Sequence, residues 1–342
     1  MANSSLLNLH SVVSGGNEHY DIRDLASRDL EPHDVVALGK ILDCLKEGDV
    51  EYQLDLQDKV INARSSLSAG ELSISSDNEG RLTGIKISSN QSCVSLSDLV
   101  RRFEDVGLNY QVVQRRQRGS DFFANVDKVA VASLSKLYIC ELVYRALESG
   151  FLEWDTSVRL KVKDLRSRSA GLRLGDVGSE ITVRDLITYA LLASDNTAAD
   201  LLLELLRSTV PQSSELSDEL NQVRSIKEVY GEAFDTDADL GLLWPSGRDY
   251  FFSINRVADS MMFLNSSSWT PWDDLGERAG GFAYKGGQAP GVLSGMWCER
   301  RSKRAERDEK VLVGFAINSP RPLAYIDEIW IIESIISGLR EM

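Results

Sequence analysis

Histidine is nearly missing from this chain of 342 residues, and all three copies lie before residue 34: His10, His19 and His33. A nucleophile in the rest of the chain therefore needs another base, unless the N-terminal arm supplies a histidine. The four cysteines do not indicate a metal site either, because they are scattered and show no Cys-x-x-Cys spacing. We therefore expect no metal site and no cofactor, and free thiols in a reducing compartment.

Long apolar runs and an excess of basic charge are also lacking. No stretch reaches the roughly 18 uncharged apolar residues of a membrane span, and residues 1–20 contain no Lys or Arg, unlike a secretory signal. The net charge of −14 argues against binding to nucleic acid or an anionic membrane. The basic residues from Arg300 to Arg304 are balanced by nearby acids, which favours a solvated hairpin. We expect a cytoplasmic protein; the sequence does not indicate its oligomeric state.

The residue pattern predicts three parts: a flexible arm (1–20), a small α+β domain (21–102) and a larger domain (103–342). In the small domain we expect helices over 20–46 and 95–106 and strands over 71–75 and 81–88.

The larger domain has strand patterns at both ends and helix patterns between them. The expected strands cover residues 109–116, 158–160, 180–181, 281–284, 292–298 and 311–318, with a turn at Gly286-Gly287. The expected helices cover residues 134–147, 182–192, 197–206, 253–263 and 324–339. Residues 134–147 are apolar nearly all round, which is typical of a buried helix. The pattern predicts an α+β sandwich whose sheet combines distant parts of the chain.

Three short motifs carry possible chemistry. Lys136 follows Ser133 by one helical turn on the same face, and a lysine that loses its charge by burial can deprotonate a serine. The alternative is a surface lysine whose stem packs on the helix. Ser-Asp-Asn occurs at Ser194, between two apolar helices, and at Ser76, where a surface turn is expected. Lys285-Gly286-Gly287 alone would indicate a plain hairpin.

Together, in this order, the motifs resemble the signature of the serine β-lactamase and penicillin-binding superfamily, with class A-like context. They are separated by 61 residues from Ser133 to Ser194 and by 91 residues from Ser194 to Lys285. The resemblance covers residues 103–342 and implies an antiparallel sheet flanked by helices, plus an all-helical subdomain. Residues 285–293, residues 249–251 and the N-terminal extension are similar to β-lactamase-like proteins found with clavulanate-type clusters.

The resemblance implies a role for each motif residue. Ser133 would be the acylated nucleophile, and Lys136 would be its base or would stabilise its alkoxide. Ser194 would pass a proton to the leaving group with help from Lys285. Asn196 would contact both the substrate amide and Lys136.

It also implies an oxyanion hole made by the backbone N–H groups of Ser133 and Gln288, with Gly287 allowing substrate close to the strand. Two departures from the family pattern stand out. Gly286 replaces a hydroxyl residue that helps to hold a substrate carboxylate. The deacylating Glu-x-x-Leu-Asn motif is missing as well; Glu228 and Glu232 are candidate bases, or else part of a solvated acidic loop.

These departures favour a serine acyl hydrolase or acyltransferase that acts as an esterase or amidase on a small acyl substrate. One alternative is a genuine β-lactamase or D,D-peptidase. The other is a non-catalytic binding protein that keeps the pocket. Trp269, Trp272 and Trp297 either line the cleft or pack in the core.

Overall fold

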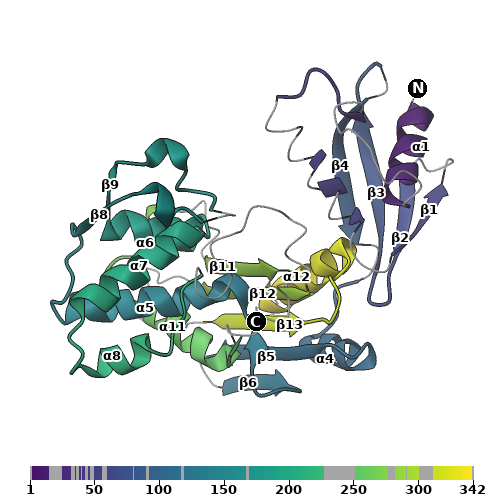
Figure 1. Ribbon diagram of the computed structural model, residues 1–342. Coiled ribbons are helices and arrows are strands. Elements are labelled where there is room, and N and C mark those ends of the chain that lie inside the picture. The colour runs from purple at the N-terminus through teal and green to yellow at the C-terminus, as the bar shows by residue number, and fades with distance from the viewer. Residues whose placement is uncertain are drawn as a thin grey trace. The chain divides into compact units, whose positions relative to one another are not determined.

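The structure is a computed structural model of the whole chain (Figure 1). It describes residues 2–14, 25–31, 35, 38–39, 41–42, 45–46, 50–55, 60–79, 81–89, 92–116, 119–166, 169–226, 251–275, 282–289, 291–299 and 311–340. About half of the helix expected over residues 20–46 therefore lies outside the described residues.

The contacts of the chain divide it into two compact units. Unit 1 comprises residues 1–108 and 319–342, and unit 2 comprises residues 109–318. This division differs from the expected one, because residues 319–342, expected in the larger domain, belong to unit 1. The reason is burial: Ala324 and Ile326 share a hydrophobic cluster with Leu9, Leu42 and Leu72 of the N-terminal segment.

Unit 1 contains an antiparallel four-stranded sheet in the order β1-β2-β3-β4. Its strands are β1 (Glu51–Asp55), β2 (Val60–Arg64), β3 (Ala69–Ser76) and β4 (Leu82–Ser89). Its helices are α1 (Ala2–Val13), α4 (Leu96–Asp105) and α12 (Tyr325–Arg340). The turn between β3 and β4 holds the Ser76 copy of Ser-Asp-Asn, where Asp77 Oδ1 accepts hydrogen bonds from the N–H groups of Glu79 and Arg81. That copy is therefore a structural turn.

The N-terminal arm is in part a helix, contrary to the expectation of a flexible segment. Helix α1 lies against β1, β2 and β3 (Figure 1). Leu9 is fully buried and Val13 nearly so, and burial of an apolar face stabilises a short helix that would be marginal alone. The sequence pattern underrated this helix because Asn8, His10 and Ser11 interrupt its apolar residues.

Unit 2 is built on an antiparallel five-stranded sheet in the order β11-β12-β13-β5-β6. Its strands are β5 (Asn109–Arg116), β6 (Gly119–Ala124), β11 (Phe282–Ala289), β12 (Val292–Glu299) and β13 (Leu312–Asn318). As predicted, the sheet joins strands from both ends of this part of the chain. The turn expected at Gly286-Gly287 is wrong, because both glycines pair within β11, with Gly295 and Ser294 of β12.

The remaining elements of unit 2 lie between the two groups of strands. The helices are η1 (Ala132–Leu134), α5 (Ser135–Glu148), η2 (Val162–Asp164), η3 (Leu174–Asp176), α6 (Val183–Leu192), α7 (Asn196–Thr209), α8 (Glu215–Leu220) and α11 (Ile254–Ser266). Two short antiparallel pairs complete it: β7 (Val129–Ala130) with β10 (Phe251–Phe252), and β8 (Ser157–Arg159) with β9 (Glu180–Thr182).

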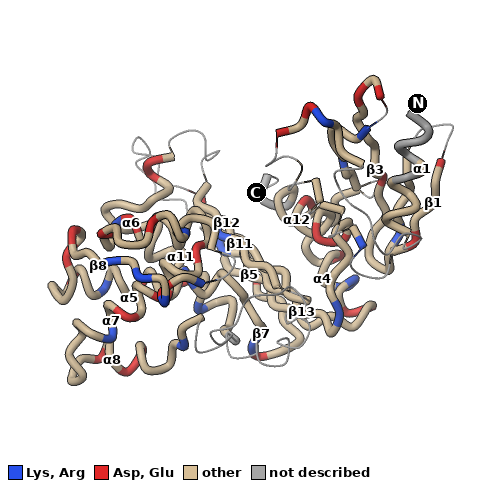
Figure 2. The backbone as a smooth tube through the Cα atoms, turned by 45° about the horizontal axis from the view of Figure 1, so that its top comes forward, with Lys and Arg blue, Asp and Glu red and all other residues tan. Residues whose placement is uncertain are grey.

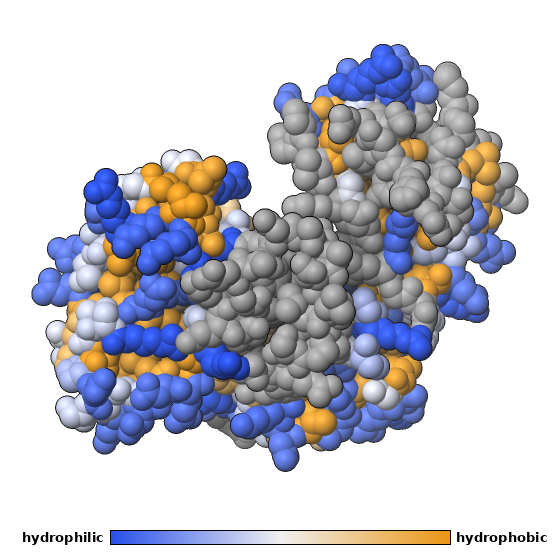
Figure 3. Space-filling view, viewed as in Figure 1, coloured by the Kyte–Doolittle hydropathy of each residue, from blue (hydrophilic) through white to orange (hydrophobic). Residues whose placement is uncertain are grey.

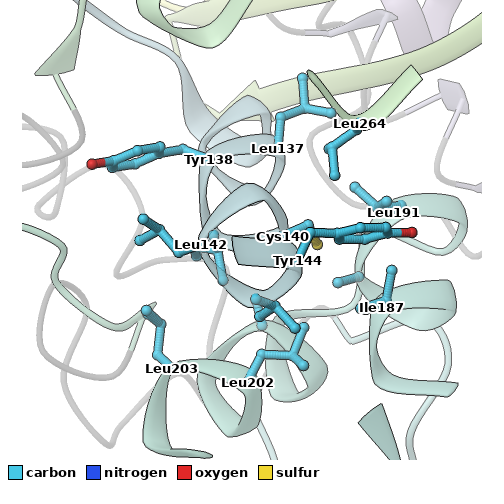
Figure 4. Close-up of a cluster of buried hydrophobic side chains, with 14 of the residues drawn as sticks. Leu137, Tyr138, Cys140, Leu142, Tyr144, Ile187, Leu191, Leu202, Leu203 and Leu264 are labelled. Atoms are coloured by element: carbon cyan, nitrogen blue, oxygen red, sulfur yellow. The ribbon is translucent and has the colours of Figure 1, made fainter. Parts of the chain in front are cut away.

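Helix α5 lies at the centre of the hydrophobic core of unit 2 (Figure 4). Leu137, Leu142 and Cys140 on different sides of α5 are all fully buried, as the unbroken apolar pattern predicts. Gly150, with φ of 72°, ends the helix in the left-handed conformation that glycine adopts without strain. The nucleophile candidate, Ser133, therefore lies in η1, directly before a helix that is packed on all sides.

Charged residues of both signs are interspersed along the backbone of both units (Figure 2). In the face seen in Figure 3, hydrophilic residues cover most of the described surface and apolar residues form smaller patches. Among the described residues, no helix combines the length and the apolar character needed to cross a bilayer.

Candidate active site

Ser133 lies in η1, where the chain passes from β7 into α5. The preceding residue, Ala132, has φ of 46°, a conformation that costs a non-glycine residue on the order of 1–3 kcal/mol. The neighbouring segment is held in place by Asn318, whose side chain accepts from the N–H of Ala130 and donates to its carbonyl oxygen. Backbone N–H groups at the start of a helix lack partners within the helix, so the Ser133 amide is suited to binding an oxyanion.

Lys136 points back along the helix to Ser133, with 2.8 Å between Nζ and Oγ. It also donates to the carbonyl oxygen of Ser194 at 2.8 Å and to Asn196 Oδ1 at 2.7 Å. The side chain is 1% exposed. Burial, and then the positive charge of Lys285, lower the pKa of Lys136 to about 7. The alternative of a surface lysine is therefore wrong.

The contacts of Lys136 suit a neutral amine. A neutral amine has two N–H groups and one lone pair, and the carbonyl of Ser194 and Oδ1 of Asn196 can only accept hydrogen bonds. When both N–H groups donate to these two oxygens, the lone pair remains for the hydroxyl of Ser133. The arrangement thus allows Lys136 to accept the Ser133 proton.

Ser194 occupies the sharp turn between α6 and α7, with φ of 54°. The buried carboxylate of Asp195 braces this turn: Oδ2 accepts from the N–H groups of Gly171 and Leu172, each at 2.9 Å, and Oδ1 accepts from that of Ala198 at 2.8 Å. Three backbone donors hold the turn in its strained conformation and aim the Ser194 hydroxyl at the two lysines. Asp195 thus has a structural position in the turn.

Lys285 reaches Ser194 from the edge strand β11. Its Nζ donates to Ser194 Oγ at 2.8 Å and to the carbonyl of Gly286 at 2.7 Å. The side chain is 2% exposed, and this burial lowers its pKa to about 8. Ser194 Oγ lies 3.3 Å from Lys136 Nζ as well. The structure therefore places Ser133, Lys136, Ser194 and Lys285 in one connected chain of contacts.

At Gly287, strand β11 lies directly against the backbone of Val131 and Ser133, just before α5. A Cβ at this position would lie 2.6 Å from the carbonyl oxygen of Val131, 2.8 Å from the amide nitrogen of Ser133 and 2.5 Å from Ser294 Oγ. Real Cβ atoms do not approach backbone this closely, so only glycine fits. The next residue, Gln288, is exposed and pairs with Leu293. Its position along β11 agrees with the predicted oxyanion role, which stays a prediction.

Gly286 has a different neighbour: a Cβ there would clash with the hydroxyl oxygen of Tyr284. The Tyr284 hydroxyl thus takes the space that a side chain at 286 would occupy. Sequence reasoning missed Tyr284, because a lone tyrosine in a strand pattern carries no functional signal. It also missed Ser294. The hydroxyl of Ser294 can donate a hydrogen bond either to the carbonyl oxygen of Val131, at 2.8 Å, or to that of Gly287, at 3.1 Å.

The two proposed deacylation bases, Glu228 and Glu232, lie outside the described residues. The three tryptophans take different positions. Trp272 is buried and borders a cavity beside the site, donating from Nε1 to the carbonyl of Tyr284. Trp269 packs edge-on against Trp154, and Trp297 packs on Tyr284.

Comparison with known proteins agrees with this geometry. The model of the beta-lactamase enzyme family matches residues 94–210, a stretch that includes Ser133, Lys136, Ser194 and Asn196. Residues 94–210 are therefore similar to this enzyme family. The predicted resemblance to the serine β-lactamase and penicillin-binding superfamily is therefore confirmed, and so is the β-lactamase-like α+β fold. The narrower likeness to proteins of clavulanate-type clusters stays a prediction.

Several solved structures are similar to this chain. A class A β-lactamase of the last common ancestor of Gram-negative bacteria is 19% identical, over 72% of this chain and 99% of that one, with a TM-score of 0.48. The class A β-lactamase from Mycobacterium abscessus is 18% identical, over 71% and 98%, with a TM-score of 0.47. A mutant of PBP-A, in an acyl-enzyme complex with penicillin G, is 13% identical, over 74% and 100%, with a TM-score of 0.44. No curated protein matches the chain.

Proposed function

We propose that this protein is a serine acyl hydrolase that cleaves small esters or amides through an acyl ester on Ser133. The observation that carries the proposal is the contact between Ser133 Oγ and the buried Lys136 amine, whose pKa is lowered to about 7. A base with a pKa near neutrality combines a large neutral fraction with useful basicity. The family match supports a serine hydrolase in general.

In the acylation step, Ser133 Oγ attacks the substrate carbonyl carbon and its proton moves to Lys136 Nζ. The tetrahedral oxyanion accepts hydrogen bonds from the N–H groups of Ser133 and Gln288. The bond to the leaving group then breaks, and the departing atom takes the proton of Ser194. Ser194 recovers a proton from Lys136, 3.3 Å away. The products are an ester on Ser133 and a free alcohol or amine.

In deacylation, water attacks the Ser133 ester while the neutral Lys136 amine takes its proton. The C–O bond to Ser133 breaks, and the serine oxygen recovers that proton from Lys136. Both half-reactions therefore use one base, and neither requires a loop carboxylate. Lys285 acts beside this path: its charge stabilises an anionic Ser194 oxygen 2.8 Å away.

A genuine β-lactamase or D,D-peptidase is the alternative that the family match favours. Most β-lactams carry a carboxylate, and Gly286 lacks the hydroxyl side chain that helps to hold it in the family pattern. This departure supports neutral esters over β-lactams. A non-catalytic binding protein is the remaining alternative from the sequence.

One experiment separates the three. The protein is incubated with p-nitrophenyl esters, a chromogenic cephalosporin and a penicillin, and the peptide that contains Ser133 is examined by mass spectrometry. We expect ester turnover and an acyl adduct on this peptide. Ser133→Ala should lose both, with turnover reduced roughly a thousandfold or more. Ser120→Ala, at an exposed serine of β6, is the matched control.

The other results have definite meanings. Fast cephalosporin hydrolysis with slow ester turnover would establish the β-lactamase. The absence of any adduct or turnover would establish the binding protein. Turnover that survives in Ser133→Ala would refute the acyl-enzyme mechanism.

A further inference from the structure

A cavity of about 530 Å³ opens beside the site, bordered on one side by Ser194, Lys285 and Gly286. Its remaining border consists of apolar or aromatic side chains: Leu191, Leu192, Trp272, Leu275, Phe282 and Tyr284. Leu192, Leu275 and Tyr284 are 39%, 38% and 45% exposed. The cavity therefore has an apolar rim that is open to solvent.

The position of the cavity relative to the two serines indicates which part of a substrate it would hold. Ser194 borders the cavity and Ser133 does not. In the mechanism above, on which this inference rests, the carbonyl carbon lies at Ser133 and the departing oxygen at Ser194. The group attached to that oxygen must then extend past Ser194, toward the cavity. The acyl group extends the other way from the carbonyl carbon.

The lining decides which leaving groups fit. Among the described residues that border the cavity, Lys285 alone carries a charge, and two of the three N–H groups of its ammonium donate to Ser194 Oγ and to the carbonyl of Gly286. Moving a carboxylate from water to apolar walls costs free energy unless it is paired and hydrogen-bonded. An uncharged apolar group gains free energy from the same transfer.

Tyr284 is the aromatic residue of the cavity wall next to Lys285. Its hydroxyl fills the space next to the Cα of Gly286, and its ring packs at 4.9 Å from that of Trp297. Trp297 in turn stacks on Phe315 at 6.0 Å. This row of rings fixes the tyrosine at the cavity edge.

We propose that this cavity is the leaving-group subsite and that it selects substrates with bulky, uncharged, apolar alcohols. Three acetate esters test this: 1-naphthyl, phenyl and 3-carboxyphenyl acetate. All three give the same acetyl-enzyme, so deacylation is common to them and differences in kcat/KM report the leaving group alone.

We expect kcat/KM to fall in the order 1-naphthyl, phenyl, 3-carboxyphenyl, with about tenfold or more between the extremes. Leu275→Arg should reduce the 1-naphthyl value about tenfold and raise the 3-carboxyphenyl value, because it adds a cation to the rim. Leu174→Arg, at a leucine of η3 that is 69% exposed and does not border the cavity, should change neither.

A second series holds the alcohol fixed as phenol and varies the acyl group from acetyl to butyryl to phenylacetyl. Leu275→Arg should leave the order of this series unchanged. A changed acyl order with an unchanged alcohol order would overturn the proposal and assign the cavity to the acyl group. Faster turnover of the 3-carboxyphenyl ester in the wild-type protein would also overturn it while leaving the acyl-enzyme mechanism intact. If none of the esters acylates Ser133, the proposed function and this inference fail together.

Discussion

Replacement of Lys285 by methionine should move the acid limb of the pH–rate profile to higher pH. Acylation requires neutral Lys136, so kcat/KM should rise with pH through its pKa of about 7. The positive charge of Lys285 is the second cause of this low pKa, after burial. Without that charge the protonated form of Lys136 is less disfavoured, and its pKa rises.

The size of the shift follows from the geometry. Both lysine nitrogens contact Ser194 Oγ, at 3.3 and 2.8 Å, so they lie no more than about 6 Å apart. At that separation and an effective dielectric constant of about 20, two unit charges repel by about 2–3 kcal/mol, or roughly two pKa units. We expect the acid limb to move up by about one to two units, still below the ordinary lysine value, because burial persists.

The assay is kcat/KM for phenyl acetate, measured from acidic to alkaline pH for wild type, Lys285→Met and Lys285→Arg. The arginine variant keeps the charge, so its acid limb should stay in place even if its rate falls. In the wild type, loss of the Lys285 charge above its pKa of about 8 should lower the rate again and give a narrow bell. An acid limb that does not move in Lys285→Met, or that moves down, would refute the assignment of Lys136 as the base.

Three further predictions concern the surroundings of the site. Asn196→Asp places a negative charge 2.7 Å from Lys136 Nζ and should also shift the acid limb of kcat/KM upward; a downward shift would contradict this. Gly287→Ala should lower the free energy of urea unfolding by about 1–3 kcal/mol and abolish ester turnover, whereas Gly175→Ala, where a Cβ meets nothing within 4 Å, should be close to neutral. Asp200→Ala removes the partner of Arg166 in a buried ion pair, at 2.7 Å, and should lower the free energy of urea unfolding by about 3–5 kcal/mol. Asp259→Ala, which breaks the more exposed pair with Arg115, should lower it by about 1 kcal/mol or less.

Much of the site was accessible from the sequence because local rules place each motif on a definite element. Capping signals indicated the start of α6 at Thr182, whose side chain accepts from the N–H of Asp185. The polar Ser194-Asp195-Asn196 between two apolar helices indicated a turn. The convergence of these elements followed from resemblance to a family, since spacing alone cannot bring together residues 61 and 91 positions apart.

Other features depend on tertiary contacts that leave no local pattern. Strand β6 is almost entirely exposed on both faces, so it lacks the alternation that predicts strands. Two consecutive glycines at 286 and 287 favour a turn locally, yet both pair within β11. The Ser133 backbone leaves no room for a side chain at 287, and the Tyr284 hydroxyl lies in the space beside 286. Helix α12 belongs to unit 1 because Ala324 and Ile326, at its start, pack in one hydrophobic cluster with Leu9 and Leu42.

The division of the chain has a consequence for its synthesis. Unit 2 starts at Asn109 and stops at Asn318, and these two residues are direct partners on β5 and β13. Antiparallel partners have Cα atoms about 5 Å apart, so unit 2 is an insertion with adjacent ends. Because residues 319–342 follow unit 2 in the chain, a ribosome synthesises all of unit 2 before the residues that complete the core of unit 1.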